Sequence, residues 1–217
     1  APRRGSECYR MSTKSYLRYV HEEAFGLIAS ARAPVVTDGR VAFCPAVHEV
    51  LVYDLRRGEL ARYMTPDGDK YLLGEITAMH LVSDAAVHET LAVGYSNGMV
   101  RCYDAAKGGS PLVSLMGHRG TIACLASSDG GMLLASGGYD TDIVLWDLVA
   151  ERGICRLRGH KDAVTAVRFL PNATPGGAEV AAGARPKLLA SSSKDGLVKV
   201  WDLATQHCAQ TIVGHRS

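Results

Sequence analysis

Two stretches of the sequence are near copies of each other: LLASGGYDTDIVLWDL at residues 133–148 and LLASSSKDGLVKVWDL at residues 188–203. In both copies a Ser is followed four residues later by an Asp, and the Asp is followed six residues later by a Trp. A Gly-His pair precedes each copy, at residues 117–118 and at residues 159–160. Polar residues that recur at fixed steps indicate an internal repeat rather than a feature of composition.

The same frame extends toward the N-terminus in weaker form. The segment LAVGYSNGMVRCYD at 91–104 keeps both steps, but it has Val93, Asn97 and Tyr103 where the stronger copies have Ser, Asp and Trp. A fainter copy, FCPAVHEVLVYDL, occupies residues 43–55. The aromatic-Asp pairs of the four copies start at residues 53, 103, 146 and 201, and are therefore 50, 43 and 55 residues apart. Repeats of about 40 to 45 residues that carry insertions are typical of four-stranded propeller blades.

The best-formed repeat predicts four strands, because short apolar runs alternate with turn residues. These strands are expected at residues 121–127, 132–138, 143–148 and 151–157. The first three are almost continuously apolar, which indicates sheets that are buried on both faces, and the polar fourth is expected at an exposed edge. In the next repeat, residues 171–186 are rich in Pro, Gly and Ala and are expected to form a solvent loop.

The composition of the 217 residues is that of an ordinary globular protein, with 47% hydrophobic and 21% charged residues. The net charge of +2 is too small to indicate a nucleic-acid or membrane partner. The six cysteines are scattered without a CxxC pair, which favours a reducing intracellular compartment over a disulfide framework. No apolar run approaches the length of a membrane span, so we expect no membrane partner.

The repeated Ser, His, Asp and Trp could be mistaken for a hydrolase triad. We interpret them as hydrogen-bond networks, because the set occurs twice at matching offsets and neither Ser lies in a GxSxG elbow. An imidazole before the first strand can bond both the Asp of the second turn and the Ser of the second strand, and that Ser can meet the indole N–H. The two predicted networks are His118, Ser136, Asp140 and Trp146, and His160, Ser191, Asp195 and Trp201.

No pattern in the sequence indicates a metal, a cofactor, a small-molecule substrate or catalysis. Three His-Glu pairs begin an HExxH zinc motif, but each lacks the second histidine. These pairs are His21-Glu22, His48-Glu49 and His88-Glu89. Phosphate-binding and dinucleotide-binding glycine motifs are absent from the chain. The basic cluster of Arg152, Arg156 and Arg158 is a hypothesis for phosphate contact only, because acidic neighbours interrupt it.

The Gly-His to Trp-Asp frame resembles the WD-repeat β-propeller family over residues 24 to 217, with two specific and two degenerate repeats. The resemblance implies an all-β fold, namely an incomplete WD-repeat propeller of about four blades, and a structural role for the polar networks. It also places the turns of Asp140 and Asp195 on the same face as the Gly-His loops. Tyr139 and Lys194, just before those aspartates, are therefore candidates for contact with a partner.

A narrower resemblance is to the tandem-propeller subunits of the small-subunit processome. The residues that carry it lie outside the shared signature: Asp142-Ile143, the run from Gly153 to Leu157, His160-Lys161-Asp162 and residues 205–208. This resemblance implies a nucleolar, non-enzymatic scaffold for pre-rRNA processing and small-subunit rRNA maturation. Its partners would be other WD-repeat processome subunits, and pre-rRNA and snoRNA contacted directly or through them. The alternative is a WD-repeat adaptor in signalling or ubiquitin ligation.

The repeat frame predicts a disordered tail over residues 1–15 and a partial propeller over residues 16–217. Its blades are expected at about 16–57, 58–108, 109–150 and 151–206, with 207–217 entering the next repeat. Because WD propellers usually close with seven blades, we expect the chain to be the N-terminal part of a longer protein.

Overall fold

The predicted repeats form four separate antiparallel sheets in a computed structural model, which describes residues 30, 32–68, 74–82, 89–172 and 186–213. The first sheet contains β1 (Val36–Thr37), β2 (Val41–Ala46), β3 (Glu49–Asp54) and β4 (Glu59–Met64). The second contains β5 (Ile76–Val82), β6 (Thr90–Tyr95), β7 (Met99–Asp104) and β8 (Val113–Met116). The third contains β9 (Ile122–Ser127), β10 (Leu133–Gly138), β11 (Ile143–Asp147) and β12 (Arg152–Leu157). The fourth contains β13 (Val164–Leu170), β14 (Leu188–Ser193), β15 (Leu197–Asp202) and β16 (His207–Val213).

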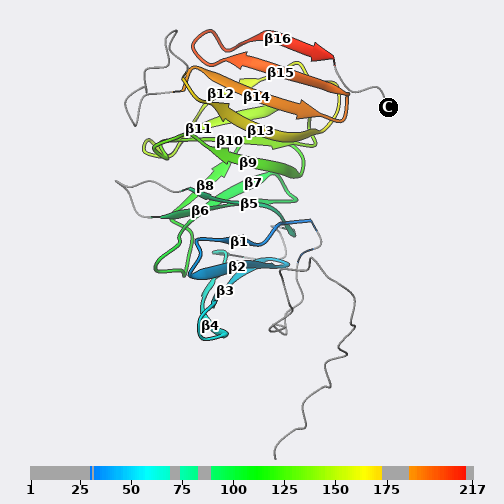
Figure 1. Ribbon diagram of the computed structural model, residues 1–217. Helices are drawn as coiled ribbons and strands as arrows, with labels where there is room; N and C mark the ends of the chain where they lie inside the picture. Colours follow the sequence, from blue (N-terminus) through cyan, green and yellow to red (C-terminus); the bar gives the residue numbers. More distant parts are fainter. Residues whose placement is uncertain (1–29, 31, 69–73, 83–88, 173–185, 214–217) are drawn as a thin grey trace, which may run out of the picture.

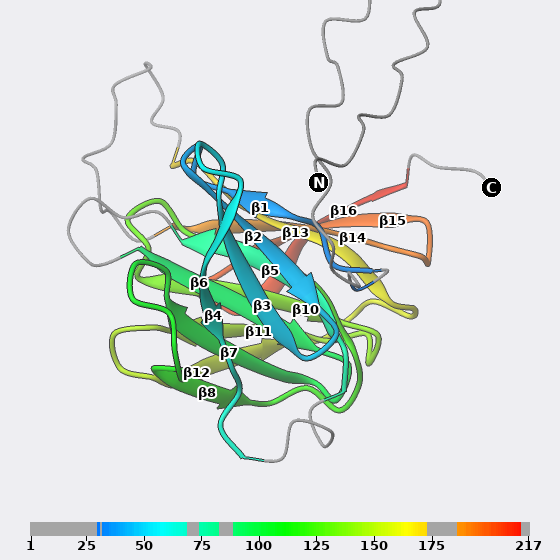
Figure 2. The same ribbon diagram turned by 90° about the horizontal axis from the view of Figure 1, so that it is seen from below.

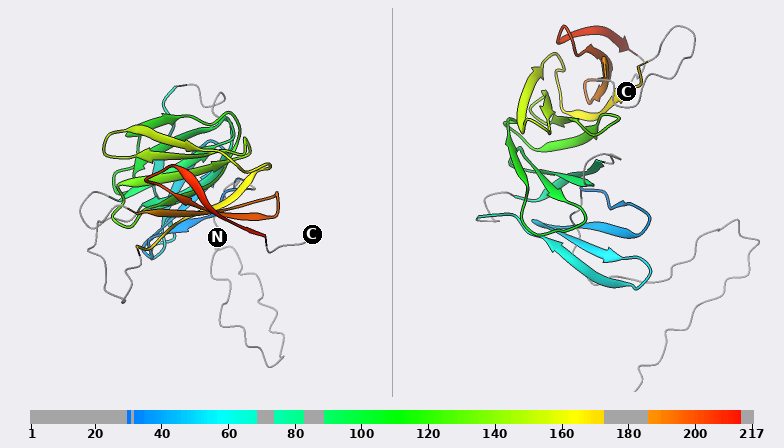
Figure 3. Two further views of the ribbon diagram at one scale, coloured as in Figure 1. Left: turned by 90° about the horizontal axis from the view of Figure 1, so that it is seen from above. Right: turned by 90° about the vertical axis from the view of Figure 1, so that its left-hand side faces the viewer.

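The sheets follow one another in chain order along an arc (Figure 1). In each sheet the strands pair in sequence order, and the first strands of neighbouring sheets contact one another. Figure 2 looks along this stack from the side of the first sheet, and Figure 3 (right) shows the first and fourth sheets at the two ends of the arc. The described residues contain strands and no helix. The predicted fold class, an all-β incomplete propeller of about four blades, is confirmed.

The apolar core is divided among the gaps between neighbouring sheets. One cluster, which includes Phe43 and Leu91, fills the gap between the first and second sheets. A second cluster around Ile122 and Trp146 lies between the second and third sheets, and a third around Trp201 lies between the third and fourth. Inner strands such as β10 are therefore buried along their whole length, whereas β16 is exposed along its whole length. Burial on both faces explains why the inner strands are continuously apolar in the sequence.

Each sheet is offset by one strand from the predicted blade ranges. The ranges 16–57, 58–108, 109–150 and 151–206 each end after the third strand of a sheet, and the fourth strand falls in the following range. For example, β12 follows residue 150 but pairs with β11, as in the register Val144 with Arg156. The hydrogen-bonded unit and the sequence repeat therefore differ, because the outer strand of each sheet comes from the start of the next repeat.

The third turn of every sheet is built around the Asp of the aromatic-Asp pair. In each turn this carboxylate accepts hydrogen bonds from the backbone N–H groups two and three residues later. The residue four positions after the Asp has a positive φ in all four turns. These residues are Gly58, Gly108, Glu151 and Gln206, with φ of 66, 69, 54 and 60 degrees. Such Asp-centred turns mimic a backbone turn and fix the exit direction of the outer strand.

Some predictions fall on residues that the structure does not describe. The tail over 1–15 and most of the loop over 171–186 lie outside the described residues, as do residues 214–217. Of the segment 207–217, residues 207–213 form β16 and belong to the fourth sheet. Within the described part of the chain, no helix is long and apolar enough to span a bilayer.

Candidate interaction surface

The structure brings His118, Ser136, Asp140 and Trp146 together inside the third sheet. His118 precedes β9, Ser136 lies in the middle of β10, Asp140 lies in the turn after β10, and Trp146 is on β11. The Nδ1 of His118 is 2.8 Å from Asp140 Oδ1, and its Nε2 is 2.8 Å from Ser136 Oγ. Trp146 Nε1 donates to the same Oγ over 2.8 Å. Since a carboxylate only accepts, His118 donates from Nδ1 and accepts at Nε2 from the Ser136 hydroxyl, so every polar atom has a partner.

The fourth sheet repeats this arrangement with His160, Ser191, Asp195 and Trp201. His160 Nδ1 is 2.9 Å from Asp195 Oδ2, its Nε2 is 2.8 Å from Ser191 Oγ, and Trp201 Nε1 donates to that Oγ over 2.8 Å. Each Asp also accepts the backbone N–H of the residue after its His, over 2.9 Å at Asp140 and 3.0 Å at Asp195. The network therefore ties the loop before each sheet to the turn between the sheet's second and third strands.

The two network aspartates are held ionised. Burial alone would raise their pKa, but hydrogen bonds from a backbone N–H and from the histidine outweigh it. The pKa of Asp140 is lowered from 3.8, and that of Asp195 is lowered to about 2. A carboxylate stabilised in this way keeps the neighbouring imidazole in one tautomer and one orientation.

The lowered pKa of Asp195 predicts an acid-dependent loss of stability. Because its carboxyl binds a proton less tightly in the folded chain than in the unfolded chain, its contribution is fully present above about pH 4 and is lost as the pH falls toward 2. Denaturant titrations at pH 5, 4 and 3 should therefore show a falling free energy of unfolding. The variant Asp195→Asn should have a shallower pH dependence, and an unchanged slope would contradict the assignment.

The second sheet replaces the network by a pair of tyrosines. Val93 occupies the position of the network Ser, and Tyr103 that of the Trp, as the sequence shows. The Tyr103 hydroxyl lies 2.9 Å from that of Tyr95, and both rings are fully buried. Burial raises the pKa of both phenols. Sequence reasoning missed Tyr95, although it stands two residues after Val93, where the stronger copies have Gly138 and Ser193.

Among the described residues there is no site for serine hydrolysis and none for zinc binding. Ser136 is 0% exposed and its Oγ is shared between His118 and Trp146, so it is closed to a substrate. His48 Nδ1 lies 2.8 Å from the carbonyl of Gly74 and so joins the first sheet to the segment before β5. No group of three His, Cys, Asp or Glu side chains that could hold a metal ion occurs within the described ranges. The pair His21-Glu22 and the histidine of the pair His88-Glu89 lie outside those ranges.

The basic cluster at β12 is largely paired with acidic and backbone oxygens. Arg156 Nη1 lies 2.6 Å from Asp142 Oδ2, and its Nη2 donates to the carbonyl of Gly117. Arg158 Nε is 3.6 Å from the same Asp142 oxygen. These contacts brace the turn after β10 against the outer strand, and they make the cluster a weaker candidate for phosphate contact.

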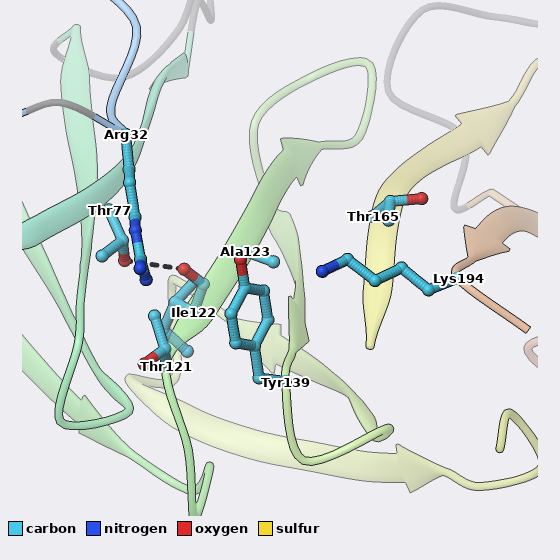
Figure 4. A pocket seen from close by; sticks show the side chains of 8 residues that line it. All are labelled: Arg32, Thr77, Thr121, Ile122, Ala123, Tyr139, Thr165 and Lys194. Atoms are coloured by element: carbon cyan, nitrogen blue, oxygen red, sulfur yellow. Dashed lines mark hydrogen bonds between the residues drawn. The ribbon is translucent and has the colours of Figure 1, made fainter. Parts of the chain in front are cut away.

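Tyr139 and Lys194 lie at one cavity of about 320 Å³ on the face that carries the network loops. Figure 4 shows the Lys194 side chain pointing toward the Tyr139 ring, with Arg32 on the other side of Tyr139. The Lys194 Nζ is 5.2 Å from the ring centroid, and Tyr139 is 45% exposed. Three threonines complete the polar wall: Thr77, Thr121 and Thr165.

The charges at this cavity are of one sign. Arg32 and Lys194 are the only charged residues that line it among those described, and no described carboxylate does so. The threonine hydroxyls are engaged within the fold: Thr77 donates to the carbonyl of Ile122 over 2.6 Å and Thr121 to that of Ser96 over 3.0 Å. The cavity is thus a rigid, cationic hollow with one exposed aromatic ring.

Comparison with known proteins shows the fold of this chain and the family to which it belongs. A family model described as the WDR3 first beta-propeller domain matches residues 40–217. Nuclear distribution protein PAC1 of Gibberella zeae is 32% identical over 164 residues, which cover 74% of this chain and 34% of the relative. Transducin beta-like protein 3 of Rattus norvegicus is 27% identical over 187 residues, which cover 86% of this chain and 21% of the relative. The chain therefore spans about a third or less of the length of these curated relatives.

Among solved structures, a chain in the crystal structure of the mitotic checkpoint complex superposes with a TM-score of 0.64. The match covers 81% of this chain and 48% of that chain at 23% identity, which shows the propeller fold alone. The family match extends from β2 to the end of the chain and includes both complete networks. The chain belongs to the WD-repeat proteins, in the family of the WDR3 first β-propeller domain.

Proposed function

We propose that this chain is a non-enzymatic scaffold of ribosome biogenesis, a WD-repeat subunit of the small-subunit processome. In this role it supports pre-rRNA processing and small-subunit rRNA maturation with snoRNA, in the nucleolus. The observation that carries the proposal is the match of residues 40–217 to the WDR3 first β-propeller family. The similarity to Transducin beta-like protein 3 over 86% of the chain supports it more weakly.

The architecture suits a scaffold because its polar residues serve the fold. The histidines, serines and aspartates of the two networks bond one another, so they hold loops instead of reacting with a ligand. Sheets that pack only on their neighbours present these loops on a fixed frame, which is how repeat folds bind partners by surface. We propose Tyr139 and Lys194 as partner contacts on the cationic hollow, with other WD-repeat processome subunits as the direct partners. Pre-rRNA and snoRNA are reached directly or through those subunits.

Affinity purification of the tagged full-length protein tests this proposal. Processome WD-repeat subunits, pre-rRNA and snoRNA should be enriched over a tag-only control, and depletion of the protein should cause unprocessed pre-rRNA to accumulate. Lys194→Glu should reduce recovery of the subunits, whereas Lys187→Glu, the same charge change beside the other end of β14, should not. Recovery of none of these components, with normal small-subunit rRNA after depletion, would refute the proposal.

The second candidate is a WD-repeat adaptor that recruits a peptide in signalling or ubiquitin ligation. The PAC1 relative from Gibberella zeae, at 32% identity over 74% of this chain, favours a role outside ribosome biogenesis. The same purification separates the two candidates, because an adaptor would recover non-ribosomal partners and no pre-rRNA. Localisation of this protein outside the nucleolus would further favour the adaptor.

A further inference from the structure

An apolar groove lies between the second and third sheets, at the end of the strands opposite to Tyr139 and Lys194. Its volume is about 290 Å³, which is enough for one or two side chains but small for a cofactor. Cys102 and Leu148 are among its buried and half-buried lining residues, and Leu112, Met132 and Val149 form its exposed rim. All eight strands of the two sheets, β5 to β12, are described, and every lining residue belongs to the described part of this chain; the connection at 83–88 lies outside it.

Leu112, one of the exposed residues of the groove, comes from an insertion that the other sheets lack. The third and fourth strands are joined by four residues in the first, third and fourth sheets, at 55–58, 148–151 and 203–206. In the second sheet this connection has eight residues, 105–112. The first four repeat the Asp-centred turn around Asp104, and residues 109–112 are additional.

The insertion is fixed at both ends by backbone hydrogen bonds. Gly109 donates to the carbonyl of Tyr63 over 2.9 Å and accepts from Thr65 over 3.1 Å, which attaches it to the outer strand of the first sheet. Leu112 donates to the carbonyl of Cys102 over 2.8 Å. Leu112 is therefore held at the groove by the backbone and is not on a free loop.

The exposed apolar side chains of the rim lie together at the groove, where their contact with water is unfavourable. Leu112 is 60% exposed and Val149 is 72% exposed. Single exposed apolar residues are common on protein surfaces, but residues from two sheets that meet at one hollow are typical of an interaction site. β8 and β12 run along the same outer side of the stack (Figure 2). The exposed side chains of Leu112 and Val149 line the groove next to these strands, so a partner can reach it.

The charge at the groove indicates the chemistry of the partner. Glu151 is the only charged residue that lines it among the described residues. Arg152, the next residue, lies on β12 opposite Asp147 and does not line the groove. A hydrophobic hollow with one carboxylate at its edge selects an apolar side chain that is accompanied by a cation.

We propose that this groove binds a segment of a partner protein that inserts a large aliphatic side chain between Leu112 and Val149 and places a Lys or Arg beside Glu151. The groove is distinct from the cationic hollow at Tyr139 and Lys194. The groove favours a positively charged partner residue, whereas the hollow favours a negatively charged one. The proposal does not depend on a role in ribosome biogenesis, because any partner with this segment would satisfy it.

Site-specific photo-cross-linking in the full-length protein tests this proposal. A photoreactive phenylalanine analogue replaces Val149, whose exposure makes the change tolerable for folding. Mass spectrometry of the product should identify one segment of another protein with a Leu, Ile or Met within four residues of a Lys or Arg. The variant Glu151→Lys should reduce the cross-link about tenfold, and reversing the partner's cation to Glu in that background should restore it.

Gln206→Lys provides the matched control. Gln206 occupies the equivalent turn position of the fourth sheet, also with positive φ, but it does not line the groove. It should leave the cross-link unchanged, as should Met116→Ser, which removes a more exposed apolar residue outside the groove. An equal yield with Glu151→Lys would overturn the proposal. The proposal would also be overturned if no cross-linked product formed. A cross-link to RNA, to an acidic segment, to residues 83–88 or to a second copy of this chain would overturn it as well. Unchanged pre-rRNA recovery in the Glu151→Lys variant would leave the processome role intact, so the two proposals fail separately.

Discussion

Replacing Trp146 with alanine should lower the free energy of unfolding by about 3–5 kcal/mol. The indole is 3% exposed and belongs to the core between the second and third sheets. It also packs closely on Gly117, where an added Cβ would lie 2.6 Å from the Trp146 ring. Its removal leaves a cavity that the neighbouring backbone cannot fill and deprives Ser136 Oγ of a donor. Urea titration followed by far-ultraviolet circular dichroism measures the loss without relying on the deleted fluorophore.

Trp146→Phe separates the two contributions to this loss. Phenylalanine restores most of the buried apolar surface but has no N–H for Ser136, so its cost should be intermediate. A cost for Trp146→Ala below about 1 kcal/mol, the typical effect of an average substitution, would contradict the central place given to this residue.

Asp140→Ala should lower the free energy of unfolding by about 3 kcal/mol. The carboxylate accepts from His118 Nδ1 and from the backbone N–H of Arg119, and its removal leaves both donors without this partner. His118 is buried, so water does not readily replace the lost acceptor. The loop before β9 should also detach from the turn after β10, which hydrogen exchange at Arg119 would detect. Denaturant titration gives the energetic cost.

Two variants test whether the network itself is responsible. Asp140→Asn keeps an acceptor for His118, so it should cost less than Asp140→Ala. Asp129→Ala removes a carboxylate from the exposed turn at the other end of β9, and it should change stability by less than about 0.5 kcal/mol. Equal effects of Asp129→Ala and Asp140→Ala would show that the loss is not specific to the network.

The sequence predicted the third sheet almost to the residue because its turns and polar positions repeat. The strands expected at 121–127, 132–138, 143–148 and 151–157 correspond to β9, β10, β11 and β12. The periodic signal faded in the second sheet, where Val93 and Tyr103 interrupt the pattern. In that sheet the hydrogen bond between the Tyr95 and Tyr103 hydroxyls stands in place of the His-Ser-Asp-Trp network. The stronger repeats have no counterpart of this hydrogen bond, so a comparison of repeats could not reveal it.

The groove and the cationic hollow were beyond sequence reasoning for a related reason. Tyr139 and Lys194 could be chosen by their place before the network aspartates, but Arg32 joins them only through the packing of neighbouring sheets. Residues 109–112 did not stand out in the sequence, because the aromatic-Asp pairs on either side of them, at 103 and 146, are only 43 residues apart, the shortest of the three spacings. Nothing in the repeat pattern shows that these residues attach to Tyr63 and Thr65 of the first sheet. Such long-range contacts depend on how the sheets stack, which the repeat pattern does not encode.

The one-strand offset between repeat and sheet has a consequence for synthesis on the ribosome. Because β8, β12 and the other outer strands come from the start of the following repeat, no sheet can be completed when its own repeat has emerged. The network of the third sheet cannot be completed before Trp146 has emerged, and β12 then follows within about ten residues, or roughly one second at ordinary elongation rates. Each new repeat therefore supplies the outer strand of the sheet before it as well as the first three strands of its own sheet, so the newest sheet of a nascent chain exposes the edge of its third strand until the next repeat begins.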